Sequence, residues 1–268
     1  MPFYLLILVA LVQGITEFLP ISSSGHLILI SELSSAPDQG LAIDVAVHIG
    51  TLCAVVLYFW RDVSMGLAGL PRMLTGRIDT AGAKLAFLLT IATLPAIVFG
   101  LVLKLTGLSD AMRSMTVIGW TMLLFGLLLW WADQRGPNDK KDTDWTTKDA
   151  LKMGLWQAVA LIPGTSRSGI CITAGRMLGY SRQDSAKLAM LMSIPTILAS
   201  GALLGAEVIT TADAQLAKDG AVAAALAFVA ALGALSLMMR LLRSVSFTPY
   251  VIYRVALGLV LLTISYSA

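Results

Sequence analysis

Residues 3–26 read FYLLILVALVQGITEFLPISSSGH. The apolar run Phe3–Val12 begins like a membrane helix, but a carboxylate, a proline, three serines and a histidine follow before Leu27–Ile30 is apolar again. Phe3–Val12 is too short to span a bilayer, which takes about 20 residues. Backbone that leaves a helix at membrane depth must be buried in protein or line a cavity, because lipid offers it no hydrogen bonds. The stretch therefore predicts a re-entrant hairpin beside a polar interior pocket.

The remainder of the chain is typical of an integral membrane protein. Of its 268 residues, 57% are hydrophobic and 13% are charged, against about 25% charged in soluble domains, and the mean hydropathy is +0.82. Continuous apolar runs exclude the alternating pattern of a β-barrel. We therefore predict an all-α, polytopic membrane protein with six spanning helices. The runs are Val45–Trp60, Leu85–Leu103, Met115–Trp131, Leu188–Ala206, Ala221–Met239 and Tyr250–Tyr266.

A second short apolar segment is interrupted in the same way as the first. Met153–Ile162 breaks at PGTSRSG, residues 163–169, and resumes as Ile170–Leu178. QGITEFLPISSSG from Gln13 and QAVALIPGTSRSG from Gln157 match in glutamine, two serines and glycine at a constant offset of 144. Three spans follow each hairpin, and an odd number of crossings inverts the second half relative to the first. We predict a first repeat at 1–132, a solvated linker loop at 133–150 and a second, inverted repeat at 151–268.

The charge distribution predicts the orientation. Most of the 19 basic residues fall in four loops, 61–84, 133–152, 180–187 and 240–249, which by the positive-inside rule are cytoplasmic. The N-terminus and the first hairpin then lie on the periplasmic side of a bacterial membrane. The modest net charge of +3 is dispersed, so nucleic-acid binding has no support. Cys53 and Cys171 lack metal-ligand spacing and fit small buried hydrophobes.

The first break gathers groups that suit an anion. Glu17 at membrane depth is costly unless paired or hydrated, and indicates a functional site or a lock to Arg167. Ser22, Ser23 and Ser24 present hydroxyls and backbone N–H groups at a helix start, and Gly25 allows a close backbone approach. His26 lies within hydrogen-bonding range of these serines.

The second break adds the matching cation. Arg167 keeps its charge at membrane depth and offers a planar donor fork that suits phosphate oxygens. Gly164, Thr165, Ser166 and Ser168 surround it with backbone amides and hydroxyls. Together they favour a tetrahedral anion rich in acceptors, which is phosphate.

Phosphoryl transfer needs a nucleophile, charge neutralisation and proton management. Arg167 supplies the charge, Glu17 is able to hold a divalent metal or to act as a base, and His26 is able to attack or to activate a serine. Mg²⁺ and Ca²⁺ both prefer oxygen ligands. His48 sits in an apolar helix with no polar neighbour in sequence, so we expect a packing role for it.

With these two motifs, the chain resembles the bacterial undecaprenyl pyrophosphate phosphatases of the bacitracin-resistance type. Their signatures, E-G-x-T-E-F-L-P-[VI]-S-S-[TS]-G-H and P-G-x-S-R-S-G, are matched by residues 14–26 and 163–169, and the likeness extends over the whole chain. The resemblance implies a divalent-cation-dependent hydrolysis of undecaprenyl pyrophosphate to the monophosphate, which recycles the lipid carrier of peptidoglycan synthesis. It also implies bacitracin resistance and a site that opens to the periplasm. Glu17, Ser22, Ser23, His26 and Arg167 fall on functional positions of the family.

The resemblance fails at one position, because Gln13 stands where the pattern has glutamate. We expect Gln13 to contact a metal through its amide oxygen or the phosphate through its amide nitrogen. Either Ser23 or His26 fits the nucleophile, and we favour Ser23. A lipid-phosphate transporter or flippase without hydrolysis is the alternative, since inverted repeats with broken helices also build transport sites. Trp120, Trp130 and Trp131 fit interfacial anchors or contacts in a homodimer equally well.

Overall fold

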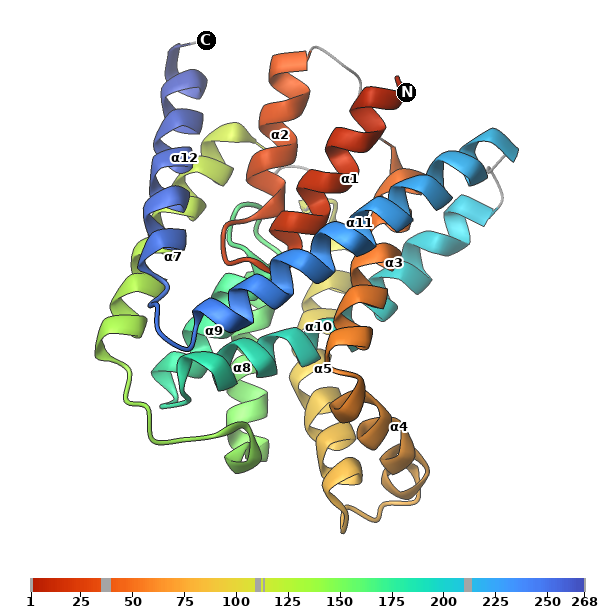
Figure 1. Cartoon of the computed structure of the whole chain (residues 1–268), viewed down its shortest axis with the longest axis vertical. Helices are drawn as coiled ribbons and strands as arrows, with labels where there is room; N and C mark the ends of the chain where they lie inside the picture. The colour runs from red at the N-terminus through yellow and green to blue at the C-terminus, as the bar shows by residue number, and fades with distance from the viewer. Residues whose placement is uncertain (1, 35–39, 109–111, 113, 210–213, 268) are drawn as a thin grey trace.

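The computed structural model describes residues 2–34, 40–108, 112, 114–209 and 214–267, and this part of the chain folds into helices joined by short irregular connections (Figure 1). Six of its helices, α3, α5, α7, α10, α11 and α12, are long and apolar enough to cross a membrane, which confirms the predicted all-α, multi-pass architecture. In chain order the elements are α1 (Phe3–Phe18), α2 (Ser23–Ser34), α3 (Leu41–Tyr58), α4 (Trp60–Leu74), α5 (Ala81–Thr106), α7 (Met115–Arg135), η1 (Asp142–Asp144), α8 (Thr147–Val159), α9 (Arg167–Met177), α10 (Arg182–Ile209), α11 (Ala214–Leu241) and α12 (Thr248–Ser267).

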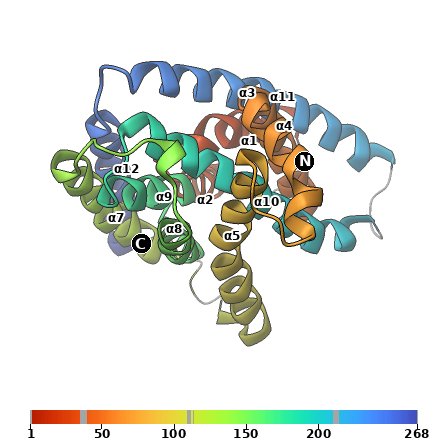
Figure 2. The same ribbon diagram turned by 90° about the horizontal axis from the view of Figure 1, so that it is seen from below.

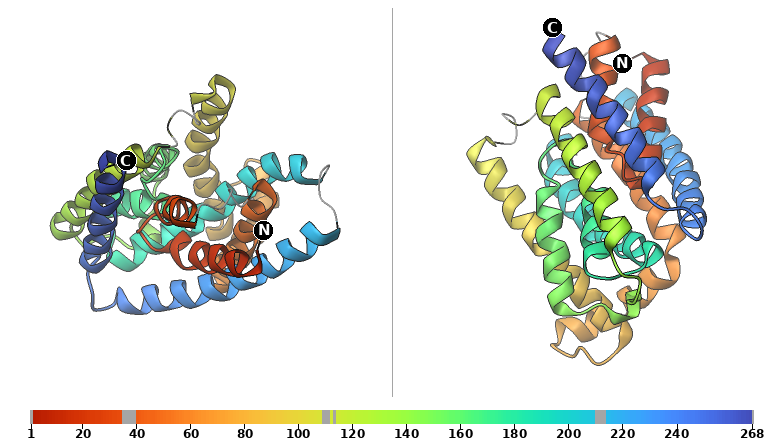
Figure 3. Two further views of the ribbon diagram at one scale, coloured as in Figure 1. Left: turned by 90° about the horizontal axis from the view of Figure 1, so that it is seen from above. Right: turned by 90° about the vertical axis from the view of Figure 1, so that its left-hand side faces the viewer.

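The two interrupted segments fold as pairs of short helices joined by irregular backbone. Residues 19–22 separate α1 from α2, and residues 160–166 separate α8 from α9. Helix α1 packs along α11, whereas α8 packs along α5, so each short helix lies against a long helix from the other half of the chain (Figures 2 and 3). Glycines permit both approaches: a Cβ on Gly14 would lie 2.6 Å from the Ala227 carbonyl oxygen, and a Cβ on Gly154 would lie 2.6 Å from that of Ala92.

Segment 61–84, predicted to be a loop, holds most of helix α4 (Trp60–Leu74). This helix lies antiparallel to the start of α5 and forms with it the lower end of the molecule in Figure 1. The helices touch through glycine, because a Cβ on Gly69 would lie 2.1 Å from the backbone of Gly82. Charged residues separate α4 from the preceding span in the sequence, but α4 retains enough apolar surface to pack against α5.

Much of the linker at 133–150 is exposed, and a few buried residues anchor it to the helices. Trp145 is 1% exposed, and Asp133 is buried with a carboxylate that binds three groups. Its Oδ1 accepts from Arg176 at 3.2 Å and from Arg182 at 2.7 Å, and its Oδ2 accepts from the Phe247 backbone N–H at 3.1 Å. A buried carboxylate requires such partners, since its desolvation is otherwise uncompensated.

A second cluster ties the linker to the turn between α9 and α10. Asp149 accepts hydrogen bonds from Tyr180 at 2.8 Å and from Lys140 at 3.0 Å. Burial would raise the pKa of Asp149, but these donors outweigh burial and hold the pKa below its ordinary value. Burial, together with the bond to Asp149, raises the pKa of the Tyr180 hydroxyl.

The four basic segments lie at one end of the molecule. Lys187 binds Asp62 and Asp142 at 2.7 Å each, which joins three of these segments. The fourth segment, 240–249, is joined through the bond from the Phe247 backbone N–H to Asp133. The N- and C-termini lie at the opposite end in Figure 1. This arrangement is the one that a positive-inside orientation requires.

Candidate functional site

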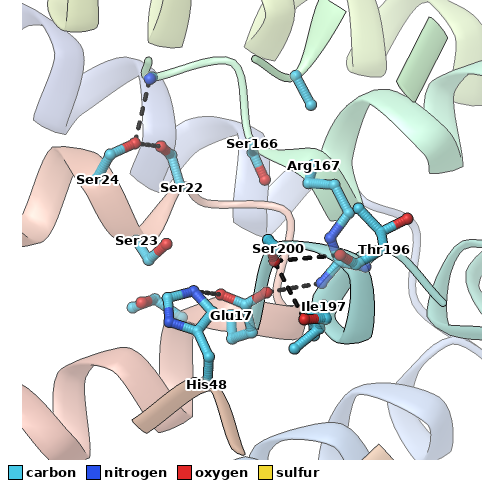
Figure 4. A pocket seen from close by; sticks show the side chains of 13 residues that line it. Glu17, Ser22, Ser23, Ser24, His48, Ser166, Arg167, Thr196, Ile197 and Ser200 are labelled. Carbon is cyan, nitrogen blue, oxygen red and sulfur yellow. Dashed lines mark hydrogen bonds and ion pairs between the residues drawn. The ribbon is translucent and has the colours of Figure 1, made fainter. Parts of the chain in front are cut away.

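The two interrupted segments, residues 13–26 and 163–169, are called the two breaks below, and they meet at a cavity of about 230 Å³ (Figure 4). Both breaks, α3 and α10 supply its walls, and most of the lining side chains are polar. The lining residues are Thr16, Glu17, Ser22, Ser23, Ser24, His48, Ala160, Gly164, Ser166, Arg167, Thr196, Ile197 and Ser200.

Three contacts hold the breaks together. Arg167 Nη2 donates to Glu17 Oε1 at 2.7 Å, and both side chains are largely buried. The Gly164 backbone N–H donates to Ser24 Oγ at 3.1 Å, and Ser168 Oγ donates to the Leu19 carbonyl at 2.9 Å. Glu17 and Arg167 thus neutralise each other, which offsets the cost of burying either charge.

The two breaks share an unusual backbone conformation. Ser22 (φ 71°) and Ser166 (φ 68°) are the only non-glycine residues with positive φ in the described ranges, and they are 144 positions apart. Each is followed by a second serine that its hydroxyl contacts: Ser22 and Ser24 at 3.1 Å, Ser166 and Ser168 at 3.2 Å. Such strained backbone clusters at ligand sites, where the surrounding structure enforces it.

Both second helices begin at the cavity. Helix α2 starts at Ser23 and α9 starts at Arg167, and both residues line the wall. Free backbone N–H groups and the helix dipole make a helix start favourable to negative charge. Two helix starts, one arginine and several hydroxyls together make this cavity suitable for a multiply charged oxyanion.

A second arginine, Arg254, donates hydrogen bonds to the backbone of the second break. The Arg254 side chain on α12 is fully buried and donates from Nη2 to the carbonyls of Gly164 at 2.9 Å and Thr165 at 2.5 Å, and from Nε to that of Met122 at 3.0 Å. Arg254 was not among the site residues predicted from the sequence. A lone arginine in an apolar span is itself a signal of function, and it would have identified this residue.

Of the twelve predicted site residues, seven line the cavity: Glu17, Ser22, Ser23, Ser24, Gly164, Ser166 and Arg167. The others lie around them. Gly25 packs against Met122, whose sulfur would be 2.5 Å from an added Cβ, and Thr165 is completely buried. Ser168 joins the two breaks through its hydrogen bond to Leu19. Gln13 and His26 are not among the lining residues.

The structure separates the two candidate nucleophiles. Ser23 lines the cavity, and no group in the described parts of the chain forms a hydrogen bond with its hydroxyl. Both ring nitrogens of His26, which does not line the cavity, already have partners: Nδ1 is 2.7 Å from the Ser22 carbonyl, and Nε2 is 2.8 Å from the Tyr253 hydroxyl. His26 therefore braces the serine turn against α12 in this conformation.

Gln13 and His48 complete the surroundings of the carboxylate. Gln13, 1% exposed, donates from Nε2 to Glu17 Oε2 at 2.7 Å, and the same nitrogen lies 3.2 Å from His48 Nε2. His48 lines the cavity, whereas the sequence analysis expected it to serve packing alone. Its polar neighbours, Gln13 and Glu17, belong to α1 and are distant in sequence, so the residues around position 48 do not predict them.

The donor set fits a divalent cation that is held largely by its substrate. No group of three or more His, Cys, Asp and Glu side chains converges among the described residues. Glu17 is the one carboxylate among the lining residues, beside several hydroxyls. Mg²⁺ commonly takes one or two carboxylates and completes its shell with water and phosphate oxygens. Glu17 would therefore hold such an ion together with a bound diphosphate.

Comparison with known proteins decides the family. The family model described as bacitracin resistance protein BacA matches residues 6–260. The chain belongs to this family. Three relatives, each named undecaprenyl-diphosphatase, come from Jannaschia sp. (70% identical), Ruegeria pomeroyi (72%) and Chromohalobacter salexigens (47%). The first two match over all of both chains, and the third covers 94% of this chain and 95% of its own.

Proposed function

We propose that this protein hydrolyses undecaprenyl pyrophosphate to undecaprenyl phosphate and inorganic phosphate. The observation that carries the proposal is the Glu17–Arg167 pair, set between two helix starts and a group of free and paired serine hydroxyls. Relatives that match over the whole chain bear the name of this activity. Hydrolysis would return the lipid carrier to peptidoglycan synthesis and, in keeping with the family, give bacitracin resistance.

We assign the nucleophile to Ser23. Its hydroxyl oxygen forms a bond to the terminal phosphorus while the bond from that phosphorus to the bridging oxygen breaks, so undecaprenyl phosphate leaves. The Ser23 proton passes to Glu17, the carboxylate in the wall. A water molecule then attacks the phosphorus while the bond from phosphorus to Ser23 Oγ breaks; Glu17 returns its proton to Ser23, and both protons of the water leave on inorganic phosphate.

Arg167 provides the charge that this reaction needs. On substrate binding its guanidinium exchanges part of its contact with Glu17 for the phosphate oxygens, where it balances the negative charge that spreads over the moving phosphoryl group. The backbone N–H groups at the starts of α2 and α9 add fixed donors. A Mg²⁺ or Ca²⁺ ion, when bound, would neutralise further phosphate charge. One carboxylate is able to serve both an ion and a proton, since it has about four acceptor sites.

The orientation follows from the charged end of the molecule. We propose that the basic end faces the cytoplasm of a bacterial cell and that the N-terminus and the opening of the site face the periplasm. The two halves are proposed to be inverted repeats with re-entrant hairpins. The matched positive φ of Ser22 and Ser166, and the exchanged packing of α1 on α11 and α8 on α5, support this relation.

A lipid-phosphate transporter is the competing function, and phosphate release separates the two. Purified protein with undecaprenyl or farnesyl pyrophosphate and Mg²⁺ is expected to release one phosphate per monophosphate formed. Arg167→Ala is expected to release none above background while remaining folded in detergent. If the wild type released no phosphate with any divalent cation, yet moved lipid phosphate across vesicle membranes, the proposal would be wrong and the transporter correct.

A further inference from the structure

His48 contacts the carboxylate region of the cavity from a helix that carries neither motif. It lies on α3, and its side chain is 39% exposed toward the cavity. Nδ1 is 2.7 Å from the Asp44 carbonyl oxygen one turn earlier, and Nε2 is 3.2 Å from Gln13 Nε2 and 3.8 Å from Glu17 Oε2. Figure 4 shows His48 beside Glu17, on the side of the carboxylate away from Arg167.

These distances determine the tautomer of the neutral ring. A carbonyl oxygen only accepts hydrogen bonds, so the proton of neutral His48 lies on Nδ1 and is donated to Asp44. Nε2 then carries a lone pair and accepts a hydrogen bond. Its nearest donor is the amide nitrogen of Gln13.

The ring in turn determines the orientation of the Gln13 amide. One amide hydrogen goes to His48 Nε2 and the other to Glu17 Oε2 at 2.7 Å, so the NH₂ group is fully used. A flipped amide would place its oxygen against the carboxylate and against the lone pair of the ring. The Gln13 oxygen is instead buried, with no hydrogen-bond partner among the described residues, a cost of the kind that a protein bears only when other contacts impose it.

We propose that His48 is a positioning residue for this reaction: by accepting from Gln13, it fixes the amide that holds one oxygen of Glu17 while Arg167 holds the other. This proposal rests on the proposed function. Glu17 is then held on one oxygen by a neutral donor and on the other by a cationic donor. Because the Gln13 amide donates to both of its neighbours, the side chain at position 48 has to accept a hydrogen bond, which a neutral imidazole does.

The test measures kcat and KM for phosphate release from farnesyl pyrophosphate, for the wild type, His48→Ala, His48→Gln, Gln13→Ala and the double variant His48→Ala/Gln13→Ala. We expect His48→Ala to lower kcat about tenfold with little change in KM. The substitution removes one hydrogen bond to Gln13, the residue that holds Glu17, and a loss of this size is what one hydrogen bond explains. His48→Gln is expected to recover most of that loss, because an amide oxygen also accepts. Leu57→Ala, on an exposed part of the same helix, is the matched control and should resemble the wild type.

The double variant distinguishes positioning from an independent effect. If His48 acts through Gln13, His48→Ala/Gln13→Ala is expected to be no slower than Gln13→Ala alone, since coupled residues are not additive. Multiplied losses, a His48→Ala variant as fast as the wild type, or a His48→Gln variant as slow as His48→Ala would overturn the proposal. An inactive wild type would instead refute the proposed function. The inference would then be decided by thermal unfolding of the same variants, in which additive losses would contradict the Gln13–His48 bond.

Discussion

The sharpest test of the site's architecture is Gly164→Ala. Gly164 has φ +84°, and a Cβ there would lie 2.1 Å from Thr121 Oγ1 and 2.6 Å from the Ile118 carbonyl oxygen. The threonine hydroxyl is able to rotate, but the carbonyl belongs to the backbone of α7. An ordinary contact begins at 3.4 Å, so the loop must move by about 0.8 Å, from 2.6 to 3.4 Å.

That movement has a cost in stability and a larger one in rate. An alanine at positive φ costs roughly 1–2 kcal/mol, and overpacking adds roughly 1–3 kcal/mol. A displacement near 1 Å at a reacting centre costs up to about 100-fold in rate, so we expect phosphate release to fall about ten- to a hundredfold. Gly76→Ala is the matched control: φ is +76°, with nothing within 4 Å of an added Cβ, far from the cavity.

The assay compares both variants at a temperature where both remain folded. Gly76→Ala should lose about 2–8 °C in unfolding temperature from its strain alone and keep its turnover, at roughly 2–4 °C per kcal/mol. Gly164→Ala should lose more in stability and much more in turnover. Equal turnover in the two variants would refute the claim that residues 163–166 position the reacting groups.

Three further predictions follow from other parts of the structure. Asp133→Ala removes the carboxylate that pairs with the buried Arg176 and the partly exposed Arg182, and it should destabilise the protein by about 3–5 kcal/mol in detergent unfolding. Asp79→Ala, which breaks an exposed pair with Arg72, should leave the unfolding temperature unchanged. The pKa of Asp149 is lowered in the folded state, so its carboxylate stabilises the protein at pH values above the pKa of the unfolded chain. This stability is lost as the pH falls through the folded pKa. Asp149→Asn should therefore reduce the pH dependence of the unfolding free energy below about pH 4. Ser23→Ala should abolish turnover and the phosphoenzyme formed from substrate labelled in its terminal phosphate, while His26→Ala should slow turnover and leave the label on serine; a labelled protein in Ser23→Ala would rule out Ser23 as the nucleophile.

Much of the fold was predictable because the bilayer imposes it. Spanning helices need a fixed length of apolar residues, and this requirement alone located all six. Helix α4 was missed because its charged residues make it look like a loop, although its glycines let it pack on α5. The burial of Trp145 was missed for a similar reason, since the linker around it is polar.

The site was predictable where chemistry demands a partner. A carboxylate and a guanidinium at membrane depth each need a counter-charge, and Glu17 and Arg167 are indeed 2.7 Å apart. His48 was not predictable, since its partner Gln13 is 35 positions away and belongs to another helix. The direction of His26 depends on Tyr253, which is more distant still. Tertiary packing, which no local pattern encodes, decides both.

A double-variant cycle tests whether the two breaks form one reacting site. Phosphate release should be measured for the wild type, Glu17→Gln, Arg167→Lys and the double variant under one set of conditions. If the two breaks act together, each single variant loses at least about a hundredfold in kcat/KM, and the double variant is no worse than the slower single one, because both substitutions damage the same group of residues. Losses that multiply in the double variant would mean that Glu17 and Arg167 act independently and that the two breaks do not form one site.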